Sequence, residues 1–391
     1  MDNNTFGKLI RSYRVQRGWK QGDLAERWGF TREYVSQIER GERKLDKLEQ
    51  VLRLADILGI PEEKLAAAGK GFPSRKTSPP PSLRDDDRLL EVLLEPAQNT
   101  VKMSWLVWKG DGAEVDMRGS LTDLAQKLDS ALDAYHGQFR KSALRLLAYT
   151  HEMLGRLAIE HVQTQQAIAH FQLMHDLAEE VGDIDIMTLA LVHQSEMFRR
   201  RGWYEASLRR MLTAEKYIRD QEVSKHIQGV LWKAAAINHF TYGNEQDFVR
   251  TIDFAVEIAE DTALTVDTLS ADFDKLEVQQ TRAQGYTMLH QPEKALAIYK
   301  QTDKLRPFRP LRDQASYAIV KAQAHCHAGD TKTGIRFALQ GMKMAESFHS
   351  TRYVIRLLQM SDRLKNTPIG QERVMIDLRE EILSTLRRMN D

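Results

Sequence analysis

Residues 21–41 read QGDLAERWGFTREYVSQIERG, and this stretch decides the fold of the N-terminal part of the chain. Its apolar residues predict two short helices joined by a tight turn. Leu24 and Ala25 fall on one face of the first helix, and Val35 and Ile38 recur at i, i+3 spacing in the second. Two helices joined in this way form the unit that lays one helix in the major groove of DNA.

The turn and the start of the second helix carry their own signals. Gly29 suits the turn, because glycine has no Cβ to clash in a left-handed conformation. Thr31 suits the N-cap of the second helix, since its hydroxyl can accept a hydrogen bond from a backbone N–H that lacks a helical partner. The side chains left on the outer face of this helix are of types that can hydrogen-bond to bases: Arg32, Glu33, Ser36, Gln37 and Arg40.

The segment from about Phe6 to Ala68 resembles the Cro/C1-type helix-turn-helix family, also called XRE. The residues that carry the resemblance stand in register through the start of the second helix, the turn and the end of the third helix: Gln21, Leu24, Ala25, Gly29, Ser36, Ile38, Glu39 and Gly41. The family usually opens its fourth helix with a proline-containing turn, whereas residues 41–46 contain no proline. The resemblance implies a five-helix DNA-binding domain over residues 1–68. The sequence predicts that this domain ends with two short amphipathic helices, at 45–58 and 61–68.

The same resemblance assigns DNA contacts to single residues. It implies that base edges are contacted by Arg32, Glu33, Ser36 and Gln37. It implies that phosphates are contacted by Gln21, Thr31, Arg40, Arg43 and Lys44. Arginine can pair with guanine, glutamine with adenine, and glutamate with cytosine. The alternative interpretation is that these side chains only form a solvated helix face.

Charge is distributed in the way that a nucleic-acid-binding head requires. The 391 residues carry a net charge of only +1, so the whole chain gives no sign of a polyanionic partner. Residues 1–76, however, hold 16 Lys and Arg against 11 Asp and Glu, which leaves the remainder at −4. A head with a charge of +5 should bind DNA weakly by itself, and the resemblance implies a homodimer that binds two half-sites.

Composition points to an ordinary cytoplasmic protein. No stretch approaches the ~18–20 consecutive apolar residues of a membrane span, and the N-terminus has no apolar signal-peptide core. The single cysteine, Cys326, allows no internal disulfide and fits a reducing compartment.

A linker is predicted between the head and the rest of the chain. Residues 69–82 lack periodicity and include three consecutive prolines at 79–81, which favour a semi-rigid, extended segment. A short helix is expected around 87–94. Residues 101–118 are compatible with either a short helix or an extended stretch, so the whole linker region is placed at 69–119.

From residue 120 to 391 the pattern is almost continuously helical and repeats every forty residues or so. The recurring segments resemble the openings of helices in helical hairpins, and they lie at 166–171, 204–208, 246–249, 293–299 and 333–338. The clearest unit resembles the rhythm of a tetratricopeptide (TPR) repeat, with small, aromatic, alanine, aromatic and terminal proline residues: Ala283, Tyr286, Ala295, Tyr299 and Pro307.

These observations predict an all-α chain, with a helix-turn-helix head and a TPR-like α-solenoid. Five to seven hairpins would stack into a right-handed superhelix that presents a concave groove. A head and body of these kinds resemble the peptide-responsive regulators of the Rap, Rgg, NprR, PlcR and PrgX type. That resemblance implies quorum sensing, with a solenoid that dimerises and holds a short signalling peptide. The alternative is a TPR adaptor, or an antagonist of a partner protein, in which DNA binding is secondary.

Candidate effector contacts come from the first helix of each hairpin, which lines the groove in such solenoids. They are His193, Gln194, Asn238, Gln280, Gln284 and Gln323. An amide side chain can both donate to and accept from an extended peptide backbone. Asn238 is the strongest candidate because it interrupts the apolar run at 234–237. The alternative for each residue is a solvated or internally bonded side chain.

No enzyme activity, cofactor or metal is expected. The sequence contains no phosphate-binding glycine loop, no Ser/His/Asp signature and no dinucleotide fingerprint. His325, Cys326 and His327 are adjacent, but positions i and i+2 of a helix point to different sides, so the three cannot share one ion.

Overall fold

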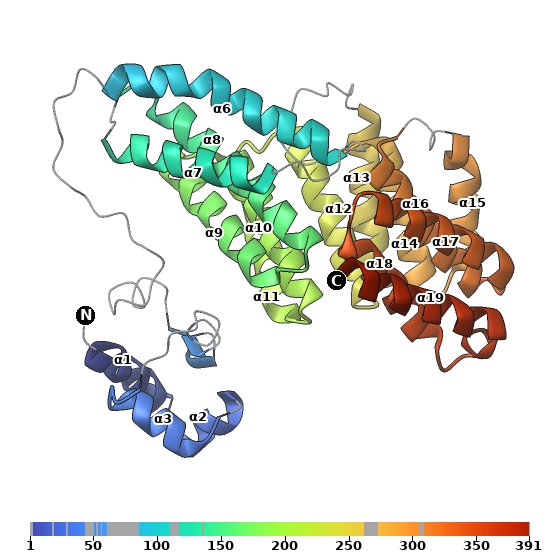
Figure 1. Cartoon of the computed structure of the whole chain (residues 1–391), viewed down its shortest axis with the longest axis horizontal. Helices are drawn as coiled ribbons and strands as arrows, with labels where there is room; N and C mark the ends of the chain where they lie inside the picture. The colour runs from blue at the N-terminus through green and yellow to red at the C-terminus, as the bar shows by residue number, and fades with distance from the viewer. Residues whose placement is uncertain are drawn as a thin grey trace. The chain divides into compact units, whose positions relative to one another are not determined.

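The computed structural model describes most of the chain: residues 3–17, 19–28, 30–43, 51, 54–55, 57–60, 86–109, 117–134, 137–261, 273–304 and 309–390. All regular elements in these ranges are helices (Figure 1), which confirms the predicted all-α class. The chain divides into two compact units, Met1–Pro79 and Pro80–Asp391. Among the described residues, no helix combines the length and the apolar character needed to cross a bilayer.

The first unit opens with three helices. They are α1 (Asn3–Gln16), α2 (Gln21–Trp28) and α3 (Arg32–Glu39), so the two predicted helices lie where the pattern put them. The predicted helix at 45–58 is described only at a few positions, which are helical and bury Val51, Leu54 and Leu58 against the first three helices. The predicted helix at 61–68 lies outside the described residues.

The second unit is a stack of helices that starts with α6 (Asp86–Lys109) and α7 (Met117–Ala134). The helices that follow are α8 (Arg140–Glu160), α9 (Thr164–Val181), α10 (Ile184–Arg200), α11 (Tyr204–Asp220), α12 (Lys225–Thr241), α13 (Glu245–Asp261), α14 (Lys275–Met288), α15 (Pro292–Thr302), α16 (Leu311–His327), α17 (Thr331–Ser347), α18 (Thr351–Leu364) and α19 (Arg373–Asn390), with a short 3₁₀ turn, η2 (Ile369–Gln371), before the last.

Neighbouring helices from α8 to α19 pair into six hairpins in the described part of the stack, within the predicted five to seven (Figure 1). The five recurring sequence segments all lie at the beginning of the second helix of a hairpin, in α9, α11, α13, α15 and α17. Pro307 lies outside the described residues. The right-handed twist and the TPR assignment stay predictions.

The structure differs from the predicted linker at 69–119, because residues 86–109 form one helix of the second unit. Leu90, Ala97, Val101 and Trp105 recur on one face of α6 and are buried against α7 and α8. Pro96 interrupts this sequence pattern without ending the helix. The carbonyl that Pro96 leaves without a helical hydrogen bond belongs to an exposed turn, where water can replace the missing N–H. Residues 69–85 and 110–116 lie outside the described residues.

A buried carboxylate joins the first hairpin of the stack to the last. Glu160, at the end of α8, is 3% exposed and accepts a hydrogen bond from Ser350, just before α18. Arg312 of α16 and Arg352 of α18 each lie 3.1 Å from its oxygens. Burial alone would raise the pKa of Glu160, but the two guanidinium groups outweigh burial and the pKa is lowered. The charged carboxylate therefore stabilises the contact between α8, α16 and α18.

We expect Glu160→Gln to lower the free energy of unfolding of the second unit by roughly 3–5 kcal/mol, because it leaves two buried guanidinium groups without their anion. Denaturant unfolding of the full chain measures this loss. Since the folded pKa of Glu160 is lowered, its contribution is complete above the ordinary value of 4.5 and is lost as the pH falls through the folded value. The difference between wild type and variant should therefore shrink in acid.

Glu180→Gln is the matched control, because Glu180 pairs with Arg140 at a more exposed site, with 40% of the carboxylate side chain accessible. Its cost should be at most about 1 kcal/mol. Equal losses in the two variants would contradict the role given to Glu160.

Candidate functional site

Helix α3 begins at a side-chain cap and buries one face. Thr31 adopts an extended backbone conformation, and its hydroxyl accepts the N–H of Tyr34 at 3.2 Å, which confirms the predicted N-cap. Val35 and Ile38 are buried, 1% and 2% exposed. The opposite face of α3 is therefore turned to solvent.

The four predicted base-contacting residues lie together on that solvent-facing side. Arg32 and Glu33 are exposed, and Ser36 and Gln37 are half-buried. On the solvent-facing side of a short helix, arginine, serine and glutamine side chains can offer hydrogen-bond donors and acceptors to base edges. Whether they touch DNA stays a prediction.

A buried ion pair holds α1, α2 and α3 together. Arg14 of α1 donates from Nε to one oxygen of Glu39 at 2.5 Å and from Nη2 to the other at 2.9 Å. Its third nitrogen, Nη1, donates to the carbonyl of Trp19 at 2.6 Å. The hydrogen bonding of Arg14 to the Glu39 carboxylate raises the pKa of Arg14. A bidentate pair of this kind fixes orientation as well as distance. It therefore fixes how the end of α3 is oriented relative to α1.

Gln21, the predicted phosphate contact at the start of α2, takes part in the same network. Its Nε2 donates to Glu39 at 2.9 Å. One of its two amide N–H groups is therefore committed to the interior, and the other remains for a phosphate.

Two glycines allow the tight packing and the tight turn at the C-terminal end of α3. A Cβ added to Gly7 of α1 would lie 2.6 Å from the carbonyl oxygen of Glu39, and closer still to that of Ile38. Gly41 has a φ of 74°, in the left-handed region that favours glycine. Gly41 donates to Ile38 at 3.0 Å and Glu42 donates to Gln37 at 2.9 Å, and these bonds close the C-terminus of the helix.

The residues after α3 that are predicted to contact phosphates have different partners in the structure. Arg40 forms an exposed ion pair with Glu42 at 3.1 Å. The Arg43 guanidinium lies 4.6 Å from the ring centre of Tyr34, which itself stacks on Phe30. Lys44 and the turn glycine Gly29 lie outside the described residues.

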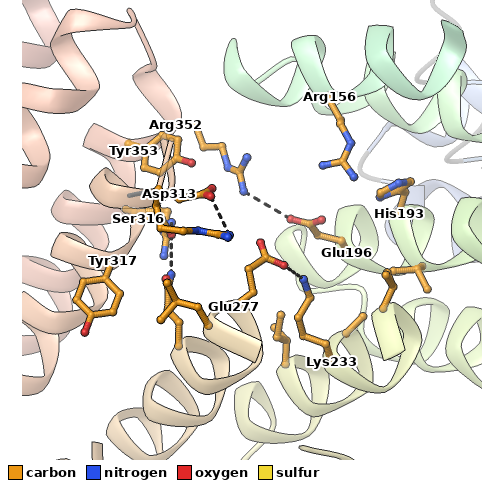
Figure 2. Close-up of a pocket in the computed structure, with 18 of the residues that line it drawn as sticks. Arg156, His193, Glu196, Lys233, Glu277, Asp313, Ser316, Tyr317, Arg352 and Tyr353 are labelled. Atoms are coloured by element: carbon orange, nitrogen blue, oxygen red, sulfur yellow. Dashed lines mark hydrogen bonds and ion pairs between the residues drawn. The ribbon is translucent and has the colours of Figure 1, made fainter. Parts of the chain in front are cut away.

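The second unit contains a cavity of about 240 Å³ between its helices. The lining residues come from α6, α8, α10, α12, α14, α16 and α18, and Figure 2 shows the polar ones. From α8 to α18 these are the first helices of the hairpins, as predicted for the groove. Four of the lining residues on α10 and α12 are apolar: Val192, Val230, Ala234 and Ile237.

Many of the other side chains that line the cavity are charged, and most of these pair with one another. Lys233 bonds to Glu277, and Arg309 lies 3.0 Å from Asp313 (Figure 2). Arg352 lies 3.9 Å from Glu196 in addition to its bonds with Glu160. The Lys233 pair joins α12 to α14 and the Arg352 pair joins α18 to α10, whereas Arg309 and Asp313 stand four positions apart.

Burial shifts the protonation equilibria in the cavity wall. Burial would raise the pKa of Glu196, but Arg200 and Arg352 outweigh it and the pKa is lowered, so the group stays ionised. Burial, with Arg156 nearby, lowers the pKa of His193, which keeps this imidazole neutral. The cavity therefore combines fixed charges with a neutral histidine.

Residues 5–68 match a family model described as a helix-turn-helix domain. No curated protein matches the chain. The match covers α1, α2 and α3 with the Arg14–Glu39 pair, and it supports a DNA-binding helix-turn-helix in the first unit.

The predicted effector residues separate into two groups. His193 and Gln280 line the cavity. Gln194, Asn238, Gln284 and Gln323 are not among its lining residues.

Three of the residues outside the lining have partners within the stack. The amide of Asn238 donates to Ser195 at 3.0 Å and Gln194 donates to the carbonyl of Phe171 at 3.1 Å. Gln323 donates to the sulfur of Met288 at 3.1 Å. The first helix of a hairpin has one face toward the cavity and another toward the neighbouring helices. These amides lie on the second face, where they form hydrogen bonds with groups inside the stack.

Residues that sequence reasoning missed include Arg14, whose partner is 25 positions away, and the arginines of α16 and α18. Arg352 and Arg356 stand four positions apart on one face of α18, which was a usable signal for a basic stripe. The histidines around Cys326 point apart: His325 bonds to Asp330 at 3.1 Å, and His327 stacks on His290.

Among the described residues, the group with suitable spacing for a cation is His175, Asp176 and Glu179 on α9. Asp176 and Glu179 are exposed, and exposed acidic groups are common without an ion.

We expect Gly7→Ala to destabilise the first unit by roughly 1–3 kcal/mol, because the added methyl group forces α1 away from the end of α3. Amide hydrogen exchange of the full chain should show faster exchange in α1 and α3. Gly22→Ala is the matched control: it also places alanine in a helix, but its Cβ meets no atom within 4 Å. It should raise stability by up to about 1 kcal/mol. Equal effects would contradict the close packing of α1 on α3.

Proposed function

We propose that this protein is a sequence-specific DNA-binding transcriptional regulator that reads DNA with α3. The observation that carries the proposal is the row Arg32, Glu33, Ser36 and Gln37, two exposed and two half-buried, on the solvent-facing side of a helix that the Arg14–Glu39 pair holds in position. The helix-turn-helix match over residues 5–68 supports it. A rigid support matters because base recognition depends on side chains held in a defined register.

In this proposal the contacts divide by chemistry. The α3 side chains read base edges, while Gln21, Thr31, Arg40 and Arg43 bind the sugar–phosphate backbone. Backbone contacts supply affinity and register, and base contacts supply specificity. Two copies of the chain would place two such helices on half-sites one helical turn apart.

The second unit is the sensory part of the proposed regulator. Its stacked hairpins resemble TPR repeats, and its cavity offers an enclosed site for an effector such as a short peptide. The cavity walls belong to six hairpins and α6, so occupancy would affect helices throughout the unit. The proposal assigns no catalytic step to the chain, and it places the protein in the cytoplasm, with DNA as its target.

A second candidate function is a protein-interaction adaptor, and one observation favours it. Tyr204, Leu208 and Leu212 follow each other at i, i+4 spacing on α11 and are 54%, 44% and 52% exposed. Exposed apolar rows of this kind are typical of protein-binding surfaces. In the regulator, the same row is available for dimerisation.

We expect Arg32→Ala and Gln37→Ala each to weaken binding to the selected DNA site by about 1–3 kcal/mol and to relax the preference at one base pair. Binding-site selection with the full chain, followed by affinity measurements at fixed salt, tests this. Arg43→Ala should instead weaken binding equally for all sequences and reduce the salt dependence by about one ion. If both α3 variants select the same site as the wild type, α3 is not the reading helix.

A further inference from the structure

The cations in the cavity wall differ in one respect, which is whether a carboxylate neutralises them. Four of the five have a carboxylate within 4 Å: Arg156 with Glu152, Lys233 with Glu277, Arg309 with Asp313, and Arg352 with Glu160. The fifth, Arg356 of α18, forms no ion pair with any described residue. Glu196 acts on it only at longer range, and Arg200 and Arg352 already share that carboxylate.

Arg356 is bound instead to a hydroxyl group. Its Nη1 donates to Oγ of Ser316 at 3.1 Å, and Gln280 donates from Nε2 to the same oxygen, also at 3.1 Å. A serine oxygen has two lone pairs, so these two bonds use its accepting capacity. The hydroxyl proton of Ser316 is then free to be donated to a further group.

The three side chains together form a cluster of hydrogen-bond donors. Arg356 retains N–H groups beyond the one given to Ser316, Gln280 retains its second amide N–H, and Ser316 offers its O–H. All three line the cavity. A cluster that offers donors and a positive charge, without a carboxylate of its own, matches an anionic oxygen group.

The electrostatic state of Arg356 agrees with this geometry. Burial, together with the nearby Arg352, lowers the pKa of Arg356 to about 10, so its charged form is less favourable than in water. A guanidinium group that has lost water without gaining an anion leaves part of its desolvation cost uncompensated. An anion in the cavity would remove that cost.

The rest of the cavity indicates what the anionic group is attached to. Figure 2 shows Ser316 and Arg352 on one side of the cavity and His193 and Lys233 on the other. The helices on the other side, α10 and α12, also supply four apolar lining residues, Val192 and its neighbours. The volume of about 240 Å³ is below the range of roughly 300–1,000 Å³ that holds drug-sized ligands, so the site fits a small molecule or one end of a longer one.

We propose that the cavity binds an amphipathic ligand, with its anionic head, a carboxylate or a phosphate, on Arg356, Ser316 and Gln280, and its apolar body against α10 and α12. The inference rests on the sensory role proposed for the second unit. It names the chemistry that the effector site recognises. Its experiment contains no DNA, so a negative result leaves the reading function of α3 untouched, and a failure of α3 to read DNA leaves this site untouched.

Isothermal titration calorimetry of the full chain tests the proposal with small probes. Hexanoate, hexyl phosphate and N-acetyl-leucine present a fatty-acid carboxylate, a phosphate monoester and a peptide-like C-terminal carboxylate. Hexanamide has the same apolar body as hexanoate but no charge. We expect at least one anionic probe to bind saturably and hexanamide to bind at least roughly tenfold more weakly, which is the loss of about 1.4 kcal/mol. The anion that binds best identifies the source of the head group.

Arg356→Met removes the charge and keeps an unbranched side chain. It should weaken the best anionic probe roughly tenfold to hundredfold, since hydrogen bonds to charged groups are strong. Arg336→Met on α17 is the control, because Arg336 is an exposed arginine outside the cavity, and it should leave probe binding unchanged.

A purely structural role for Arg356 predicts a different result. If the cation only held the fold, Arg356→Met would lower the unfolding temperature without the probe. We expect that temperature to be unchanged or raised, since a half-buried charge without a carboxylate partner disappears. Ser316→Ala provides a second variant with a smaller structural change, and it should weaken the probe several-fold. The proposal is overturned if no anionic probe binds, if hexanamide binds as tightly as hexanoate, or if both cavity variants retain wild-type affinity.

Discussion

The second unit depends on the buried carboxylate of Glu160 and the two arginines that neutralise it. A stack of helical hairpins is held together mainly by contacts between neighbours in sequence. The bonds from Glu160 to Ser350 and Arg352 span 190 and 192 positions and join the beginning of the stack to its end. Arg352 is also part of the cavity wall. The same carboxylate that closes the stack therefore fixes one of the charged groups that a ligand would meet.

The first unit uses a buried pair in the same way on a smaller scale. Arg14 and Glu39 pair in the interior, and this pair holds the buried side of α3 against α1. In both units, paired charges thus stabilise the helices that carry the proposed contact residues. Arg356 is the cavity counterpart of the exposed Arg32: each is a guanidinium without a carboxylate partner among the described residues.

Local features of the sequence predicted the local features of the fold. Thr31, Val35 and Ile38 lie within one or two turns of the same helix. A short stretch of sequence therefore holds all the information needed to predict the cap and the buried face. The pairing of Arg14 with Glu39 depends on how α1 lies across α3, which no short pattern encodes. The short helix expected around 87–94 is longer in the structure, since the turn at Pro96 is exposed and α6 continues through it.

The effector site shows a different limit of sequence reasoning. The apolar run before Asn238 correctly indicated a buried helix, and the first helices of the hairpins do line the cavity. The direction of the Asn238 side chain depends on the neighbouring hairpin. Its amide N–H donates to Ser195, and its oxygen accepts from Ser207. The cations of α18 were not among the predicted site residues, and the carboxylates that pair with Arg352 lie on helices distant in sequence.

Helix α6 gives the cavity a mechanical connection to the start of the second unit. Trp108, near its C-terminal end, lines the cavity and accepts a hydrogen bond from Arg312 through its carbonyl. The helix has 24 residues and is therefore about 36 Å long. Leu90, Ala97, Val101 and Trp105 bury this helix against α7 and α8 along much of that length. A change in the packing at Trp108 would therefore act on the same helix that contacts α7 and α8 toward Asp86.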